Sequence, residues 1–299
     1  MIQINLKNSI LVYIYILISS QTGIIFEMKK LVHIVILFIL SGTIQIVSAL
    51  ERDRLGLVKE GEFSLLTGLE YEEGDYGTPD TTSLWRIPFS ASYRKTNFSF
   101  FASVPLLFAS SDGNIVINSK TTMPKMTTLS DTSGPRNNIV TGIGDAVLSG
   151  SYYFTPGYRK QTEFRLTAIY KLAIADVDKG FGTGEDDVSF EAGAAKNIDE
   201  FTISGTLGYE ISGDSPDFTY NDVFYGTLGL TKQLPGYSQI GSYLFFSQAL
   251  TDTTDDPLEL SVFYRQPVAK TRSIYLFLSK GFSNGSPDFS MGGSLQIYY

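Results

Sequence analysis

The sequence predicts an all-β protein: a transmembrane, antiparallel, up-and-down β-barrel of about 12 strands that follows a cleaved signal peptide. Three observations lead to this prediction. Apolar and polar residues alternate with a period of two in segments of about ten residues, which is the strand period and the length of a tilted strand crossing a bilayer. The connections between the segments are alternately short and long. Aromatic residues gather at both ends of the apolar faces, as they do at both membrane interfaces.

The amino-terminal region has the pattern of a secretory signal peptide. A basic start at Met28–Lys30 precedes an apolar run over 31–40, and small residues end at Ala49. We therefore expect residues 1–49 to be a signal region with its true start at Met28 and cleavage after Ala49. Residues 50–299 would then form the outer-membrane β-barrel. A second short apolar run precedes Met28, and a long basic region before the signal core is the alternative interpretation.

Composition excludes several classes of function. The chain has 31 acidic and 23 basic residues, no Cys, and one His, His33, which leaves with the signal region. Cleavage also removes Lys7, Lys29, Lys30 and Glu27, so the mature chain has a net charge of −10. With neither imidazole nor thiol, Ser–His–Asp catalysis, Asp–His proteolysis and metal sites with His or thiolate ligands each lose an essential member. We therefore expect no enzyme activity, no cofactor and no metal site, and the acidic balance argues against a nucleic-acid partner.

The segments with a period of two occupy most of the chain after residue 61. We assign 12 of them, at 62–72, 83–93, 97–108, 143–154, 163–173, 188–197, 201–212, 222–232, 239–249, 258–266, 273–282 and 288–299. An unpaired backbone group costs several kcal/mol in hydrocarbon, so such a sheet must close on itself. Pro88 and Pro105 interrupt the hydrogen-bond ladder in the second and third segments, and we expect a local bulge there.

The long connections share one end of the predicted barrel and carry most of its negative charge. They lie at 73–82, 109–142, 174–187, 213–221, 250–257 and 283–287. The first five, read with their flanking strand ends, hold 17 acidic and 4 basic residues. Long connections are extracellular in outer-membrane barrels, which predicts the cell outer membrane, with lipid and lipopolysaccharide as neighbours. Tyr299, on the apolar face of the last segment, resembles the terminal aromatic residue that the outer-membrane assembly machinery reads.

The inward faces collect charged side chains. These candidate pore-lining residues are Glu62, Glu70, Arg86, Glu163, Arg165, Lys171, Glu191, Glu210, Glu259 and Arg265. One interpretation is a lumen that filters solutes by charge; the other is a set of pairs that neutralise one another and plug a narrow barrel. Twelve strands lie between filled barrels of eight and open ones of 16. The longest loop, 109–142, would fold inward as a constriction or cap the mouth as a mobile lid.

The glycine-rich segment 179–187 invites two further interpretations. A phosphate loop is excluded because the segment precedes a strand, lacks the Lys-Ser/Thr ending and ends in three acids. Asp176 and Asp178 do not complete the spacing of a calcium loop. We expect a solvated loop, with contact to divalent ions at the lipopolysaccharide layer as the alternative.

Two stretches carry a resemblance to a known family. Gly142-Ile143-Gly144-Asp145 opens a strand, and Tyr170-Lys171-Leu172 is followed by Gly180-Phe181-Gly182-Thr183-Gly184 and Asp187. They resemble the GxGD segment and the K-L-P-T-G…G-x-G-T-G-x-x-D stretch of the transporter family associated with the meta-pathway of phenol degradation. Ala173-Ile174-Ala175 replaces the expected Pro-Thr-Gly. The resemblance implies an outer-membrane barrel that moves hydrophobic or aromatic compounds, and it assigns no site residues.

The sequence thus favours an outer-membrane channel or transporter for passive or selective uptake of small solutes, hydrophobic or aromatic ones included. The alternative is a non-conducting structural or adhesion barrel, whose acidic extracellular loops bind divalent ions, lipopolysaccharide or a partner. A barrel enzyme and a soluble secreted β-sandwich are the remaining classes.

Overall fold

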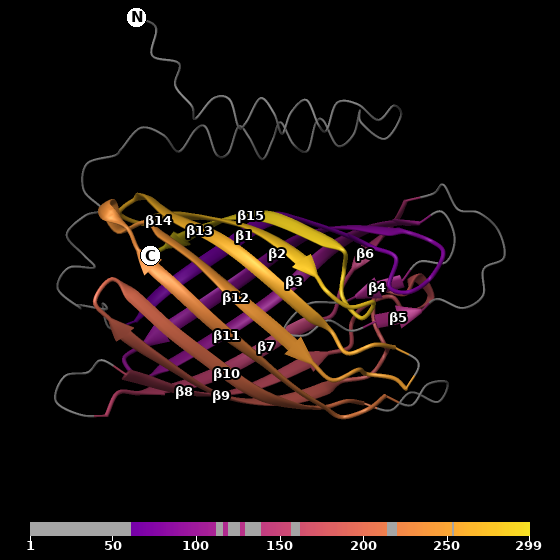
Figure 1. Ribbon diagram of the computed structural model, residues 1–299, viewed down its shortest axis with the longest axis horizontal. Helices are drawn as coiled ribbons and strands as arrows, with labels where there is room; N and C mark the ends of the chain where they lie inside the picture. Colours follow the sequence, from indigo (N-terminus) through magenta and orange to yellow (C-terminus); the bar gives the residue numbers. More distant parts are fainter. Residues whose placement is uncertain are drawn as a thin grey trace, which may run out of the picture. The chain divides into compact units, whose positions relative to one another are not determined.

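β-Strands make up most of the described part of the chain (Figure 1). The structure, a computed structural model, describes residues 61–111, 116–118, 126–128, 139–156, 162–213, 220–252 and 254–299. The predicted signal region lies outside these residues. No helix in the described ranges is long and apolar enough to cross a membrane.

The strands follow one another with only short helical interruptions. They are β1 (Glu62–Gly74), β2 (Thr82–Lys95), β3 (Phe98–Ser111), β4 (Val116–Asn118), β5 (Met126–Thr128), β6 (Val140–Ile143), β7 (Ala146–Phe154), β8 (Thr162–Leu172), β9 (Asp187–Ile198), β10 (Phe201–Ile211), β11 (Val223–Gln233), β12 (Gln239–Ser247), β13 (Leu258–Ala269), β14 (Arg272–Gly281) and β15 (Phe289–Tyr298). Two short 3-10 helices are η2 (Val177–Lys179) and η3 (Pro235–Tyr237).

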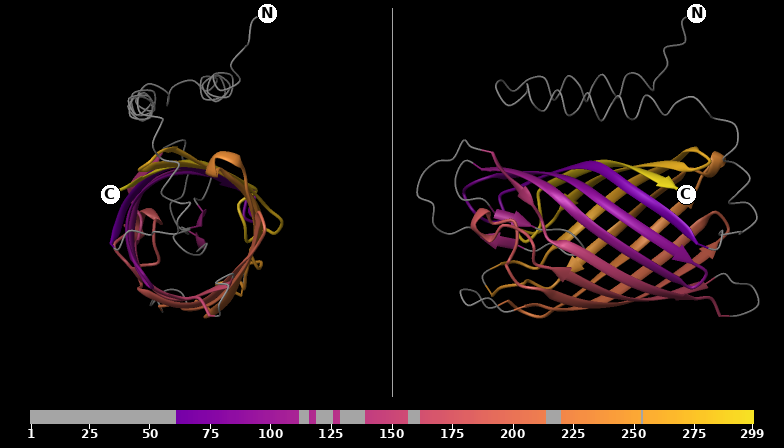
Figure 2. Two further views of the ribbon diagram at one scale, coloured as in Figure 1. Left: turned by 90° about the vertical axis from the view of Figure 1, so that its left-hand side faces the viewer. Right: turned by 180° about the vertical axis from the view of Figure 1, so that it is seen from behind.

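The main sheet closes into the predicted barrel. Successive strands pair antiparallel, and β15 pairs with β1, where Ser64 faces Tyr298. β6 and β7 both pair with β3, one after the other along the same edge, so they are two parts of one interrupted strand. The closed barrel therefore has 12 strands, as the sequence predicts, and its ring is visible along the axis in Figure 2. β4 and β5 form a separate two-stranded sheet.

The expected bulge does not lie between β2 and β3, where the two prolines face each other. It lies on the other side of β3, between β3 and the interrupted strand. Pro88 directly faces Pro105, and the β2–β3 register passes through this pair without a shift. The extra residue instead lies in the interrupted strand, where 143–147 run opposite 103–106 of β3. There the Gly144 N–H donates to the Pro105 carbonyl at 2.9 Å. Because proline has no N–H to donate, Pro105 leaves its neighbour free to bulge.

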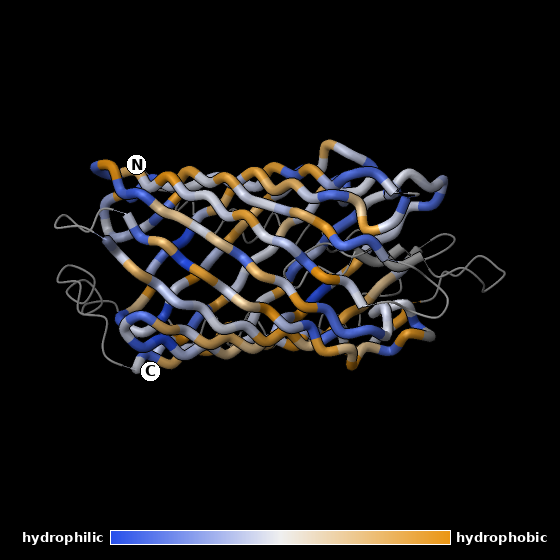
Figure 3. Tube along the Cα trace, turned by 90° about the horizontal axis from the view of Figure 1, so that it is seen from below, coloured by the Kyte–Doolittle hydropathy of each residue, from blue (hydrophilic) through white to orange (hydrophobic). Residues whose placement is uncertain are grey.

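The outer surface of the barrel is apolar. Hydrophobic and hydrophilic residues alternate along the strands (Figure 3), and large apolar side chains with the outward phase are highly exposed, among them Leu207 at 66% and Phe224 at 62%. Soluble monomers rarely expose apolar surface on this scale. A closed sheet with a lipid-compatible exterior is the β-architecture that spans a membrane, and bacterial outer membranes contain such barrels.

Aromatic side chains mark both rims of this apolar surface. At the end that carries the long connections, the ring centroids of Tyr71 and Trp85 lie 4.7 Å apart. At the opposite end, which carries the short turns, Phe63 contacts Tyr299 at 6.0 Å. These positions match the two predicted girdles, and they place the long connections at the extracellular end and the short turns at the periplasmic end.

Candidate functional site: the barrel lumen

All ten predicted pore-lining residues have the inward phase of their strands. They are Glu62 and Glu70 on β1, Arg86 on β2, Glu163, Arg165 and Lys171 on β8, Glu191 on β9, Glu210 on β10, and Glu259 and Arg265 on β13. The structure thus brings them together around one lumen, while the selection of solutes by these charges stays a prediction.

Ion pairs connect neighbouring strands across the inner face. Arg86 bridges β2 to β1, with its guanidinium 3.2 Å from the Glu70 carboxylate and 3.6 Å from the Glu72 carboxylate. Arg165 of β8 lies 3.5 Å from Glu191 of β9. Each pair joins side chains on adjacent strands, because residues with the same phase face each other across the ladder.

The periplasmic half of the lumen holds looser contacts. Arg94 lies 3.6 Å from Glu163, with both side chains about 40% exposed (39% and 43%), and Glu62 faces Arg94 in the β1–β2 ladder. Arg265 donates a hydrogen bond to the Tyr298 phenol at 2.7 Å. Because the Arg94 and Glu163 side chains are exposed, their charges are accessible to solutes and ions. An exposed pair of this kind contributes little to stability.

Burial of the inward side chains increases toward the extracellular end. Glu72, Leu84, Leu107, Glu210 and Glu259 lie near that end and are at most 5% exposed. Most inward residues near the periplasmic turns are only half-buried, although Ser64 and Ser273 are buried. The inward side chains are therefore packed more closely near the extracellular end than toward the periplasm.

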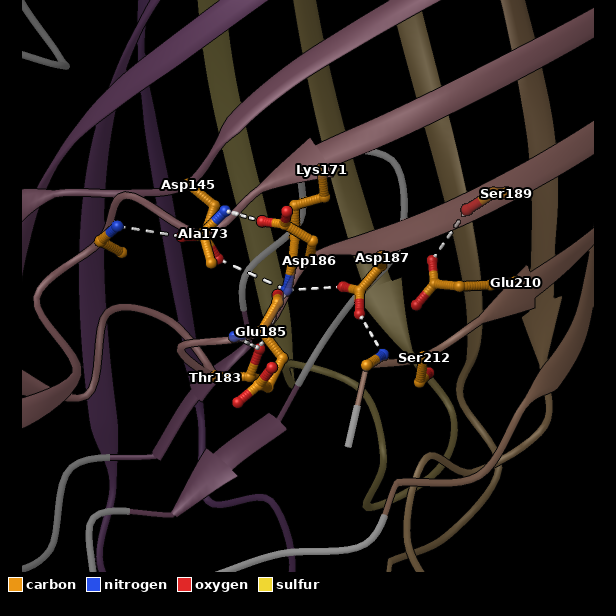
Figure 4. Close-up of polar contacts among 12 residues, drawn as sticks. Asp145, Lys171, Ala173, Thr183, Glu185, Asp186, Asp187, Ser189, Glu210 and Ser212 are labelled. Atoms are coloured by element: carbon orange, nitrogen blue, oxygen red, sulfur yellow. Dashed lines mark hydrogen bonds and ion pairs between the residues drawn. The ribbon is translucent and has the colours of Figure 1, made fainter. Parts of the chain in front are cut away.

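A buried charge cluster lies where the interrupted strand meets β8 and β9 (Figure 4). We call Lys171, Asp187, Asp145 and Thr183 the Lys171 cluster. The Lys171 ammonium lies 2.5 Å from the Asp187 carboxylate, 3.5 Å from the Asp145 carboxylate and 3.1 Å from the Thr183 hydroxyl. The Lys171 side chain is 7% exposed, and the two carboxylates still less. One cation thus holds two carboxylates from different strands.

The Lys171 cluster also fixes the backbone of the connection between β8 and β9. Asp187 accepts a hydrogen bond from the Gly213 N–H at 3.0 Å, which joins the cluster to the connection after β10. On the connection between β8 and β9, Asp145 accepts one from the Ala175 N–H at 3.0 Å. At the outer edge of the same connection, Asp186 accepts from the Ala173 N–H and from a tyrosine phenol, and these bonds lower the pKa of Asp186. Side-chain carboxylates thus satisfy backbone donors that no strand pairs.

The connection 173–187 folds into the barrel mouth. Phe181 is fully buried and packs in one cluster with Leu84 of β2 and with Leu107 and Ala109 of β3. All three partners have the inward phase. A Cβ on Gly142 would lie 2.6 Å from the Phe181 ring, so this position must stay without a side chain. The expectation of a solvated loop is wrong for 180–183, whose side chains and backbone are buried.

Loop 109–142 is described only in part, through its strand ends and the sheet β4–β5. The choice between a constriction and a mobile cap involves residues outside the described ranges and stays a prediction. Among the described residues, the connection that folds into the barrel is 173–187.

Several residues of the lumen were not among the sequence candidates. Glu72 has the same phase as Glu62 and Glu70, so the alternation could have identified it. Asp145, Thr183 and Asp187 stand in the motifs that carry the family resemblance, and their grouping around Lys171 gives these motifs a structural role. No group of three or more metal-ligating side chains is gathered in the described part of the chain.

Comparison with known proteins agrees with this geometry. The model of the family described as "Putative MetA-pathway of phenol degradation" matches residues 76–295. The chain belongs to this family. The match includes both resembling stretches and therefore the whole Lys171 cluster. No curated protein matches the sequence.

Solved outer-membrane proteins are similar to this member of the phenol-degradation family. The COG4313 outer membrane channel from Pseudomonas putida F1 superposes with a TM-score of 0.61 at 12% identity, over 81% of this chain and 97% of that one. The KdgM porin gives a TM-score of 0.49 at 10% identity, over 79% and 99%. The CymD monoaromatic hydrocarbon channel gives 0.43 at 13% identity, over 86% and 94%.

Proposed function

We propose that the protein is an outer-membrane channel through which small solutes, hydrophobic ones included, diffuse passively. The observation that carries this proposal is a closed barrel of 12 strands whose inward polar side chains remain partly exposed in the periplasmic half. The COG4313 structure is described as an outer membrane channel, and the family description refers to phenol degradation. No catalytic role is proposed.

The lumen carries more negative than positive charge. Its described inward carboxylates number nine: Glu62, Glu70, Glu72, Asp145, Glu163, Asp187, Glu191, Glu210 and Glu259. Its bases number five: Arg86, Arg94, Arg165, Lys171 and Arg265. An excess of carboxylates along a pore attracts cations, so cations are expected to pass more readily than anions.

Planar-bilayer recording tests this function. We expect the purified protein to conduct, with a reversal potential in a KCl gradient that shows preference for potassium. Glu163→Gln should reduce this preference because Glu163 is exposed to the lumen. Glu73→Gln, with the outward phase on β1, should leave it unchanged. Absence of any conductance would contradict the channel, and anion preference would contradict the role of the carboxylates.

A second candidate is a non-conducting structural or adhesion barrel. The observation that favours it is that Arg86, Arg165 and Lys171 are all in ion pairs, while the inward side chains are packed more closely near the extracellular end. The same recordings distinguish the two candidates. For either function we propose outer-membrane lipid and lipopolysaccharide as neighbours, and assembly through Tyr299, which is 65% exposed.

A further inference from the structure

One wall of the lumen carries a row of aromatic side chains. Tyr243 of β12, Phe263 of β13, and Tyr275 and Phe277 of β14 have the inward phase of their strands. We call these four residues the aromatic ladder. All four are partly exposed, and none belongs to either buried apolar cluster of the described residues. Their rings are therefore partly accessible from the inside of the barrel.

The rings form a continuous series across three strands. The centroids of Tyr243 and Phe263 lie 6.4 Å apart, those of Phe263 and Tyr275 5.5 Å, and those of Tyr275 and Phe277 6.1 Å. These separations lie within the range of attractive aromatic contacts, so the ladder is held in place by its own members.

Glycines on the neighbouring strands let two of the rings lie against the wall. Gly241 faces Phe263 and Gly292 faces Phe277 in the ladders. A Cβ on Gly241 would lie 2.7 Å from the Phe263 ring, and a Cβ on Gly292 would lie 2.5 Å from the Phe277 ring. Each ring thus covers the glycine opposite it, an arrangement known from aromatic–glycine pairs in sheets. A ring that lies along the wall presents a face to the lumen.

We propose that the aromatic ladder is a stacking surface that favours planar aromatic solutes over saturated solutes of the same size and charge. This inference rests on the proposed channel function and names a specificity-determining surface within it. A flat ring gains contact with the exposed ring faces, whereas a puckered saturated ring of equal volume gains less. The ladder spans three adjacent strands, so a solute can move between neighbouring rings while it crosses the lumen.

Block of the ion current tests the inference with a matched pair of probes. Benzyltrimethylammonium and (cyclohexylmethyl)trimethylammonium carry the same permanent charge and differ in aromaticity, and neither crosses lipid readily. We expect the aromatic probe to block the wild-type channel at lower concentration. The double variant F263L/F277L should reduce the ratio of the two blocking constants about threefold to tenfold. F263Y, which keeps the ring, should preserve the ratio.

The matched control is F101L. Phe101 also has the inward phase, but it lies on β3 with Ser92 and Ser149 as its cross-strand partners, so this variant should keep the wild-type ratio. A conducting wild-type channel that blocks equally with both probes would overturn the ladder, as would a double variant that folds, conducts and keeps the full ratio. A wild-type protein that does not conduct would instead overturn the channel function. Equal loss of the ratio in F101L would show that any inward ring serves, which also contradicts the ladder.

Discussion

Replacement of Lys171 by methionine is expected to lower the free energy of unfolding by about 3–5 kcal/mol, because it leaves two buried carboxylates without their cation. Asp145 and Asp187 lie 3.5 and 2.5 Å from the Lys171 ammonium and are almost fully buried. Mutual repulsion of the two carboxylates should release the connection 173–187 from the mouth. Denaturant titration of the barrel in detergent or lipid measures the first effect, and a higher single-channel conductance would report the second.

Lys179→Met is the matched control on the same connection. Lys179 pairs with Asp176 at 3.0 Å, but both side chains are more than 40% exposed (46% and 41%). Exposed pairs contribute at most about 1 kcal/mol, so this variant should unfold near the wild-type midpoint with unchanged conductance. If the two lysine variants had equal stability, the Lys171 cluster would not hold the connection in place.

Truncation of Phe181 to alanine is expected to cost about 3–5 kcal/mol, the usual range for a buried phenylalanine. Phe181 is fully buried and packs against Leu84, Leu107 and Ala109, so its removal leaves a cavity between the connection and the barrel wall. The connection then loses its apolar contact with β2 and β3. We expect a lower unfolding midpoint and more frequent open events in single-channel recordings.

Val177→Ala provides the comparison for Phe181→Ala. Val177 begins η2 on the same connection and is 49% exposed, so its truncation should change stability by no more than about 0.5 kcal/mol. Identical channel records for Phe181→Ala and wild type, despite a lowered midpoint, would show that the connection stabilises the barrel without limiting passage.

The barrel could be predicted from the sequence because its determinants are local. A period of two assigns each side chain to one face without any knowledge of the partner strand, which is why all ten charged candidates have the inward phase. Connection lengths and rim aromatics such as Trp85 and Tyr299 then orient the barrel. The predicted bulge depends on pairing, and the structure places it beside Gly144, on the other side of β3 from Pro88.

The arrangement of the mouth could not be predicted in the same way. The Lys171 cluster joins side chains on the interrupted strand, β8, the following connection and β9, so it depends on register and on the inward fold of the connection. Phe181 is a single apolar residue between two glycines, so no periodicity indicates that it is buried. The aromatic ladder could not be predicted either, because its rings meet only when β12, β13 and β14 pair in the observed register.

The Lys171 cluster has a consequence for the order of assembly. Its members span residues 145–187 and lie on strands that follow one another, whereas barrel closure pairs β1 with β15, where Ser64 meets Tyr298. Contacts between near neighbours in sequence form with a smaller entropic cost than contacts between chain ends. We therefore expect strands β6 to β9 and the connection 173–187 to fold together before β1 pairs with β15 and closes the barrel. The wall then closes around a segment already in position, so the connection 173–187 does not have to enter a finished barrel.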